Sequence, residues 1–115
     1  MSKIFVFGSN LAGRHGKGAA AHAKFKHGAI YGIGEGMQGR SYAIPTKDEN
    51  IKTLPLDKIE VFVDTFMDYA YLHPELEFQV TKIGCGLAGY LESQIAPMFR
   101  GASENCHLPD LWRDM

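Results

Sequence analysis

Glycine is concentrated in two segments of this chain, and each segment follows an apolar run. Of the 13 glycines in 115 residues, nine lie between residues 8 and 39 and three between residues 84 and 89. The apolar runs before them, residues 3–7 and 78–83, are rich in β-branched and aromatic side chains, which predicts buried strands. No regular element tolerates such glycine density, so each strand is predicted to lead into a loop.

One helical pattern follows residues 8–18 of the first glycine segment and another follows the second segment, so the order of strand, glycine loop and helix occurs twice. The other predicted elements are helices over 19–25, 56–73 and 92–99, strands over 29–31, 41–44 and 105–108, a loop over 32–40 and a polar tail over 109–115. Strands that alternate with helices predict a three-layer α/β fold with a mixed central sheet and helices on both faces. The chain length predicts a single domain over residues 1–115.

Composition narrows the classes of partner. With 12 Lys and Arg against 13 Asp and Glu, the net charge is −1, which argues against an extended nucleic-acid footprint or a membrane-surface site. No apolar run approaches the roughly 20 residues that cross a bilayer, and no secretory signal pattern is present. The two cysteines form no paired motif. We therefore expect a soluble, cytoplasmic protein with reduced thiols and no membrane partner.

The glycine loops lie where open α/β sheets bind ligands. Each follows the carboxyl end of a predicted strand and precedes a helix N-terminus, whose free N–H groups attract anions. A Walker A loop is excluded, because Leu11 stands where its first glycine belongs and Gly18 where its hydroxyl residue belongs. About thirty residues follow the dinucleotide-like pattern at Gly84, too few for the fold it normally opens. We expect an anion site of another kind; tight turns without a ligand are the alternative.

Three segments resemble the macro domain family of ADP-ribose-binding α/β modules. Residues 15–28 look like its glycine-alanine entry to a ligand-binding helix, residues 42–47 like a strand that ends in Thr-Lys, and residues 82–89 like its phosphate loop. The Thr-Lys ending is similar to the small lysine-dependent branch, which removes ADP-ribose from modified macromolecules. The resemblance implies a macro-like fold, ADP-ribose or a related nucleotide as ligand, an ADP-ribosylated macromolecule as partner, and no cofactor.

The resemblance assigns most of the glycine-loop residues to ligand binding. The later loop would wrap the diphosphate and the distal ribose through backbone N–H groups, with Gly84, Gly86, Leu87, Ala88, Gly89 and Tyr90 as its matched residues. The earlier loop would face the ribose beside the scissile bond, with Gly8, Ser9, Gly16, Gly18 and Ala19 as its matched residues. The ring of Tyr90 would lie against a ribose or an adenine face.

The resemblance implies catalytic roles for Lys47 and Asn10. The matching lysine attacks the anomeric carbon of the ribose, which requires an unprotonated amine. Asn10 stands near the place of a family asparagine that faces the same ribose, although the family's Asn-Ala-Ala-Asn motif is absent. Ala88 occupies the position of an acidic residue that helps to release the product. Turnover therefore stays open, with Glu92 or Glu35 as the candidate replacement for that acid.

Three functions remain after this comparison. The chain binds ADP-ribose and hydrolyses ADP-ribosyl linkages, or it senses or sequesters such a nucleotide without catalysis, or it is a small interaction protein with no nucleotide ligand. His15, His22 and His27 are close in sequence, but no metal-binding spacing accompanies them, so no metal site is predicted. Cys85, between two glycines, is either a reactive thiol or a small side chain packed under the loop.

Overall fold

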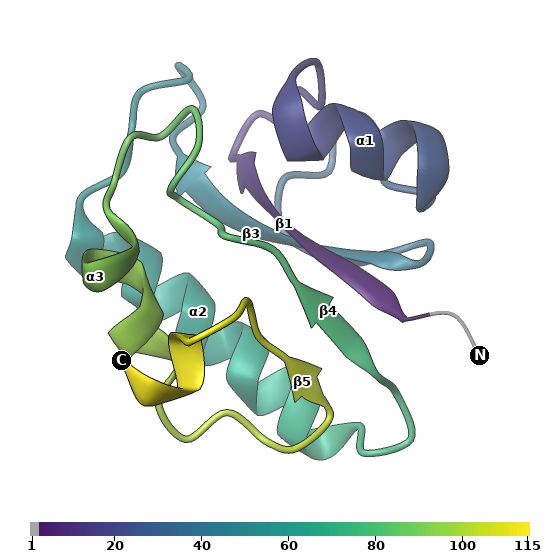
Figure 1. The fold of residues 1–115 in the computed structure, drawn as a ribbon. Coiled ribbons are helices and arrows are strands. Elements are labelled where there is room, and N and C mark those ends of the chain that lie inside the picture. The colour runs from purple at the N-terminus through teal and green to yellow at the C-terminus, as the bar shows by residue number, and fades with distance from the viewer. Residues whose placement is uncertain (1–2) are drawn as a thin grey trace.

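A five-stranded sheet forms the middle layer of the computed structural model, which describes residues 3–115 (Figure 1). Its strands are β1 (Ile4–Asn10), β2 (Gly36–Gln38), β3 (Ser41–Lys47), β4 (Phe78–Val80) and β5 (Cys106–His107). They lie in the order β2-β3-β1-β4-β5, and all neighbours are parallel except β2 and β3. The helices are α1 (Gly18–Lys26), α2 (Leu56–Leu72) and α3 (Glu92–Ile95), with 3₁₀ turns η1 (Ala96–Phe99) and η2 (Trp112–Asp114). The first two residues of the predicted domain lie outside the described residues.

Helices cover both faces of the sheet, with α1 on one face and α2 and α3 on the other (Figure 1). Successive side chains of a strand point to opposite faces, and β1 follows this rule. Ile4 and Val6 belong to the large core under α2 and α3, while Phe7 belongs to a smaller core under α1. The three-layer α/β fold with a mixed sheet is therefore confirmed.

Small side chains let α1 lie close to the sheet. Ala20 and Ala23 of the helix are buried against Phe7 and Ala43 of the strands. α2 presents the larger apolar stripe predicted from its sequence, with Ile59 among its fully buried residues. Within residues 3–115, no helix combines the length and the apolar character that a bilayer crossing requires.

The structure corrects two predictions around β2. Residues 29–31 form no strand, and the loop predicted over 32–40 contains β2. Gly36 pairs with Ala43, and Gln38 pairs with Ser41, in an antiparallel ladder on β3. Local glycine density disfavours a strand, but the open edge of β3 supplies the backbone partners that hold this segment extended.

β3 continues to Lys47 instead of ending at Ile44 as predicted. Proline is tolerated at a sheet edge because it has no N–H to give to the ladder. β2 pairs only with the first three residues of β3. Pro45 therefore lies where the outer edge of β3 has no neighbouring strand. The additional length carries Lys47 to the end of the sheet, where it pairs with Asn10 after a register shift that leaves Thr46 as an extra residue in β3.

The C-terminal part of the chain also differs from the prediction. β4 ends at Val80 rather than at residue 83, although Thr81 still bonds to the β1 carbonyl of Val6 through both its N–H and its hydroxyl. The helix predicted over 92–99 is split into α3 and η1, and the predicted closing strand is β5. The predicted polar tail contains η2, in which Trp112 is buried against Phe99. Burial of this large aromatic side chain stabilises the turn although the neighbouring residues are polar, which explains why the segment is not an extended tail.

Candidate functional site

A cavity of about 870 Å³ opens at the carboxyl ends of β1, β3 and β4. It lies between the N-terminus of α1 and residues 84–90, which we call the 84–90 loop. Ligand pockets commonly enclose about 300–1,000 Å³, so a nucleotide-sized molecule fits this space. The lining residues are Gly8, Ser9, Asn10, Arg14, Gly16, Lys17, Gly18, Ala19, Ala20, Thr46, Lys47, Ile51, Thr81, Lys82, Ile83, Gly84, Cys85, Gly86, Leu87, Ala88 and Glu92.

The cavity brings together residues 8–20 of the first glycine segment and residues 84–88 of the second, which are about seventy residues apart in sequence. Every residue assigned to the site from the sequence lines it, with the exceptions of Gly89 and Tyr90. Because β1 and β4 are parallel neighbours, the loops that follow them leave the same end of the sheet. Sheet topology thus explains why these segments meet.

The N-terminus of α1 faces this cavity without a side-chain cap. Lys17 is the N-cap residue, its side chain makes no capping bond, and the first turn contains no acidic residue. The first N–H groups of a helix have no acceptor within the helix, and they carry a partial positive charge. A methyl group added at Gly16 would meet no atom within 4 Å. An anion can therefore approach the backbone here.

The 84–90 loop is shaped by one glycine that the fold requires and by one that leaves space. Gly84 has a φ of 76°, and a Cβ at this position would lie 3.0 Å from the Ile95 side chain. Gly86 has no atom within 4 Å of the position of a Cβ. The loop closes on itself through a 2.8 Å bond from the Tyr90 N–H to the Gly84 carbonyl.

Tyr90 holds the 84–90 loop from outside the cavity. Its hydroxyl donates to the Leu54 carbonyl over 2.7 Å, and its ring packs against the large core. Thr53 adds a second bond, from its hydroxyl to the Ala88 carbonyl over 3.2 Å. Tyr90 therefore anchors the loop and does not line the cavity, and its contact with a ribose or adenine face stays a prediction.

Cationic side chains outnumber carboxylates in the lining. Arg14, Lys17, Lys47 and Lys82 all line the cavity, against Glu92 as the carboxylate of the lining set. Within residues 3–115, ion pairs involve none of the first three cations. Together with the α1 N-terminus, these charges favour an anionic ligand.

Lys47 and Asn10 lie side by side at the carboxyl ends of β3 and β1, but only one of the two side chains is bonded to the backbone. Lys47 is half-buried at the end of β3, and its carbonyl accepts a bond of 2.9 Å from the Leu11 N–H. The Asn10 amide accepts from the Arg14 N–H over 2.9 Å and donates to the Arg14 carbonyl over 3.0 Å. Asn10 therefore shapes the turn after β1, whereas the Lys47 amine makes no such bond to any of residues 3–115.

Glu92 is the acidic residue that the structure brings to the cavity, and both of its oxygens have partners. Trp112 donates to one oxygen over 2.8 Å, and Lys82 donates to the other over 3.3 Å. The Trp112 bond, followed by the Lys82 contact, lowers the pKa of Glu92. Glu92 is thus an ionised, positioned carboxylate. Glu35 is exposed and does not line the cavity.

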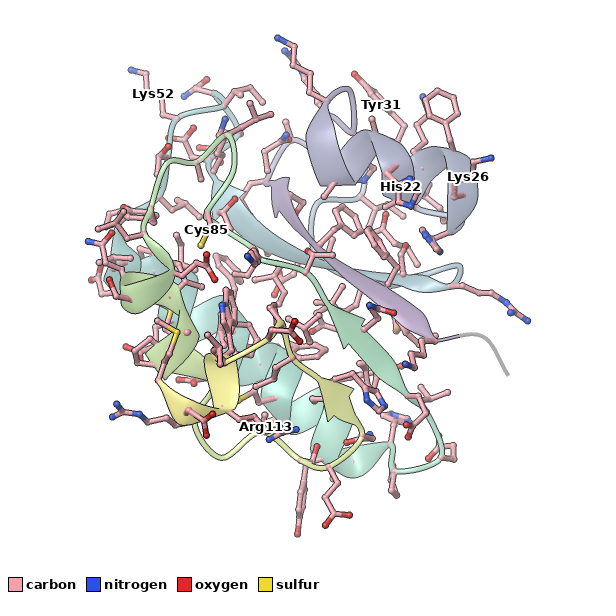
Figure 2. All side chains as sticks on the ribbon, viewed as in Figure 1. His22, Lys26, Tyr31, Lys52, Cys85 and Arg113 are labelled. Atoms are coloured by element: carbon pink, nitrogen blue, oxygen red, sulfur yellow. The ribbon has the colours of Figure 1, made fainter. Side chains whose placement is uncertain are left out.

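Cys85 lies at the start of the 84–90 loop, as Figure 2 shows. Burial raises the pKa of its thiol, and the nearby charge of Glu92 raises it further. A thiol with a raised pKa is a poor nucleophile near neutral pH. The interpretation of Cys85 as a small packed side chain is therefore favoured over that of a reactive thiol.

The three histidines lie outside the cavity lining. The buried His15 ring nitrogen Nε2 contacts the Ile33 carbonyl at 2.9 Å. His22 and His27 contact each other through their Nε2 atoms at 3.2 Å near the C-terminal end of α1, where Figure 2 labels His22. Over residues 3–115, no group of three His, Cys, Asp or Glu side chains could hold a metal ion.

Several lining residues were not identified from the sequence, and they include most of the cations. Arg14, Lys17 and Lys82 lie inside or directly beside the glycine segments, so the signal that would have found them is positive charge within a predicted anion loop. Thr46 and Thr81 enter the lining because each stands next to the end of a strand. Their positions depend on where β3 and β4 end, and both strands end at other residues than predicted.

Comparison with known proteins identifies the fold but no family. No protein-family model matches the chain, and no curated protein matches it. The chain is similar to a solved structure from Bacteroides thetaiotaomicron that is titled as a protein of unknown function. The two are 15% identical with a TM-score of 0.58, and the match covers 86% of this chain and 80% of the other. At this identity, the similarity supports the α/β fold alone.

Proposed function

We propose that this protein binds ADP-ribose or an ADP-ribosyl group in the cavity between α1 and the 84–90 loop. The observation that carries the proposal is the meeting of both glycine segments with four cationic side chains in a cavity of nucleotide size. Free backbone N–H groups and Lys or Arg side chains are the groups that bind phosphate oxygens. The resemblance to macro domains selects ADP-ribose from among the nucleotides that such a site accepts.

Each part of the ligand has a matching part of the cavity. The diphosphate would lie between the α1 N-terminus and the backbone of Gly86. A Cβ added at Gly16 or at Gly86 would meet open space there. The distal ribose would then lie toward the ends of β1 and β3, near Lys47. Arg14 and Lys82 would neutralise the remaining phosphate charge from the two sides of the cavity.

Lys47 would act as the nucleophile in removing ADP-ribose from a modified macromolecule. Its amine nitrogen would form a bond to the anomeric carbon while the bond from that carbon to the modified group breaks. The proton lost by the amine would pass to the leaving group. Water would then hydrolyse the lysine adduct, which releases ADP-ribose and restores the amine.

A second candidate function is binding without turnover, and the arrangement around Ala88 favours it. Glu92, the carboxylate in the lining, already accepts a hydrogen bond through each oxygen, which makes it a poorer replacement for the acid that the lysine-dependent branch carries at this position. A protein of this kind would sense or sequester the nucleotide. The two functions share the ligand site and differ only in chemistry.

Calorimetry with ADP-ribose tests the binding. We expect saturable binding by the wild type, and absence of binding at millimolar ADP-ribose would refute the proposal in favour of a protein with no nucleotide ligand. Turnover of an ADP-ribosylated protein or nucleic acid separates the two candidate functions. Turnover that is lost in Lys47→Ala but kept in Lys52→Ala would establish catalysis by Lys47, whereas wild type without turnover would establish the binding module. Lys52 is the matched control, because it lies outside the lining and is exposed in the connection that follows β3, where Figure 2 labels it.

A further inference from the structure

We infer that the cavity recognises the diphosphate and ribose of its ligand and does not select the base. This inference rests on the proposed function and concerns the ligand class of the same site. It predicts that nucleoside diphosphate riboses with different bases bind with similar affinity.

The neutral polar side chains of the lining are already committed to the protein. Asn10 bonds to the backbone of Arg14 through both amide atoms. The Ser9 hydroxyl donates to the Gly34 carbonyl, and the Thr46 hydroxyl donates to the Ser9 carbonyl. Thr81 donates to the carbonyl of Val6. Each of these side chains therefore already has a partner within the protein.

The acidic side chain of the lining is committed as well. A carboxylate that accepts from an exocyclic amino group is a direct way to select adenine or cytosine. Glu92 already accepts from Trp112 and Lys82, one through each oxygen. A base amino group that bonded to Glu92 would have to share an oxygen with one of these donors.

The side chains that remain uncommitted suit phosphate and an apolar ring face. Arg14, Lys17 and Lys47 are cations without a carboxylate partner among residues 3–115. Leu87 and Ile51 are apolar lining residues with 65% and 38% of their surface exposed. Contact with a ring face is tolerant of base identity, because every base has such a face.

Leu87 is well placed for this contact. Its Cδ1 atom lies 3.7 Å from the position of a Cβ on Gly18, so this side chain reaches from the 84–90 loop to the α1 N-terminus. A base held there would lie against methyl groups instead of hydrogen-bonding groups. The lining contains no aromatic residue that would strengthen stacking of one base over another.

Calorimetry with four ligands tests the inference: ADP-ribose and its analogues with hypoxanthine, guanine or uracil in place of adenine. We expect dissociation constants within about threefold of one another, because a base-edge contact that selects one base changes affinity by roughly tenfold or more. Binding of ADP-ribose at least tenfold tighter than all three analogues would overturn the inference and leave the proposed function standing. Failure of all four to bind would overturn the proposed function and the inference together.

Leu87→Ala provides a second readout. We expect it to weaken ADP-ribose and the hypoxanthine analogue by the same factor, since both lose contact with the same methyl groups. A loss confined to ADP-ribose would overturn the inference. The matched control is Leu91→Ala, because Leu91 is 66% exposed on the same segment but does not line the cavity. This control should bind all four ligands as the wild type does.

Discussion

The hydroxyl of Tyr90 donates a hydrogen bond to the carbonyl of Leu54 over 2.7 Å. Leu54 follows Thr53, which forms a bridge with Lys47 and also bonds to the Ala88 carbonyl. Two separate bonds therefore join the 84–90 loop to the segment that carries the candidate nucleophile. Residues outside the cavity thus set the distance between the 84–90 loop, which would contact the diphosphate, and Lys47, which would contact the distal ribose.

Tyr90→Phe should loosen this connection without changing the cavity lining. Loss of one net hydrogen bond lowers the free energy of unfolding by about 1 kcal/mol, and a less ordered loop should weaken ADP-ribose binding. Urea unfolding and calorimetry measure the two effects. Tyr71→Phe is the control, because Tyr71 lies exposed on α2 and its hydroxyl has no hydrogen bond among residues 3–115. Equal effects of the two substitutions would contradict this role for Tyr90.

Alanine substitution at two glycines of the 84–90 loop should separate folding from binding. Gly84→Ala places a side chain at positive φ and against Ile95, so it should lower the free energy of unfolding by about 1–3 kcal/mol. Gly86→Ala meets open space and should change stability by less than about 0.5 kcal/mol. Its methyl group should nevertheless weaken ADP-ribose binding by about tenfold, because it occupies cavity space. A stable Gly86→Ala variant with unchanged affinity would mean that the ligand does not approach this loop.

Glu92 should make the stability of the protein dependent on pH. Its pKa is lowered from 4.5 by the bond from Trp112 and by Lys82, so the unfolded chain binds its proton more readily than the folded chain. The stabilisation by Glu92 is therefore fully present above pH 4.5 and is lost as the pH falls through the lowered value. Urea unfolding should show wild type more stable than Glu92→Gln at pH 7, with the difference closing in acid. Solvent exposure keeps the effect small.

A suitable control is Glu104→Gln. Glu104 is exposed, and its carboxylate makes no ion pair or hydrogen bond within residues 3–115. The difference from the wild type should stay close to zero at both pH values. A gap between wild type and Glu92→Gln that persists below the lowered pKa would contradict the electrostatic explanation.

Features with a local cause were predictable from the sequence. The apolar run of β1 and the helical repeat of α2 each reflect burial that recurs at a fixed spacing. α2 lies close to its predicted range, whereas β1 begins near residue 3 as predicted but continues beyond residue 7 to Asn10, into the predicted loop. The two glycine segments could be assigned to one site, because parallel strands place the loops after them at the same end of a sheet. The topology then brought them together.

Features with a distant partner were not predictable. β2 is a strand only because β3 has an open edge, and Pro45 could remain in β3 only because β2 is short. The hydroxyl of Tyr90 bonds to a carbonyl 36 residues away, which assigns this ring to anchoring. The indole of Trp112 donates to Glu92 across 20 residues, so the candidate acid already has a hydrogen-bond partner that the sequence did not indicate. Such pairings depend on the completed fold and leave no periodic signal.

Asn105 is a further residue whose importance only the structure reveals. Its side-chain amide nitrogen lies 2.9–3.0 Å from the carbonyls of Ala70, His73 and Leu76, where α2 ends and the chain turns toward β4. The last carbonyls of a helix receive no bond from an N–H group within the helix, so a donor from outside must satisfy them when they are buried. Asn105 is 7% exposed, and Ser103 donates to its side-chain oxygen over 2.6 Å.

Asn105→Asp should therefore destabilise the protein more than Asn105→Ala, although aspartate has nearly the shape of asparagine. Alanine removes the donor that the three carbonyls share, although those of Ala70 and His73 keep backbone bonds from the N–H groups of His73 and Leu76, and should lower the free energy of unfolding by about 1–3 kcal/mol. Aspartate also lacks this donor, and it adds a buried negative charge against the carbonyl oxygens. Urea unfolding at pH 7 measures both variants, with Asn50→Asp as a control at an exposed position, which should remain close to the wild type. A milder effect of aspartate than of alanine would show that residue shape, rather than the donated hydrogen bonds, holds the end of α2.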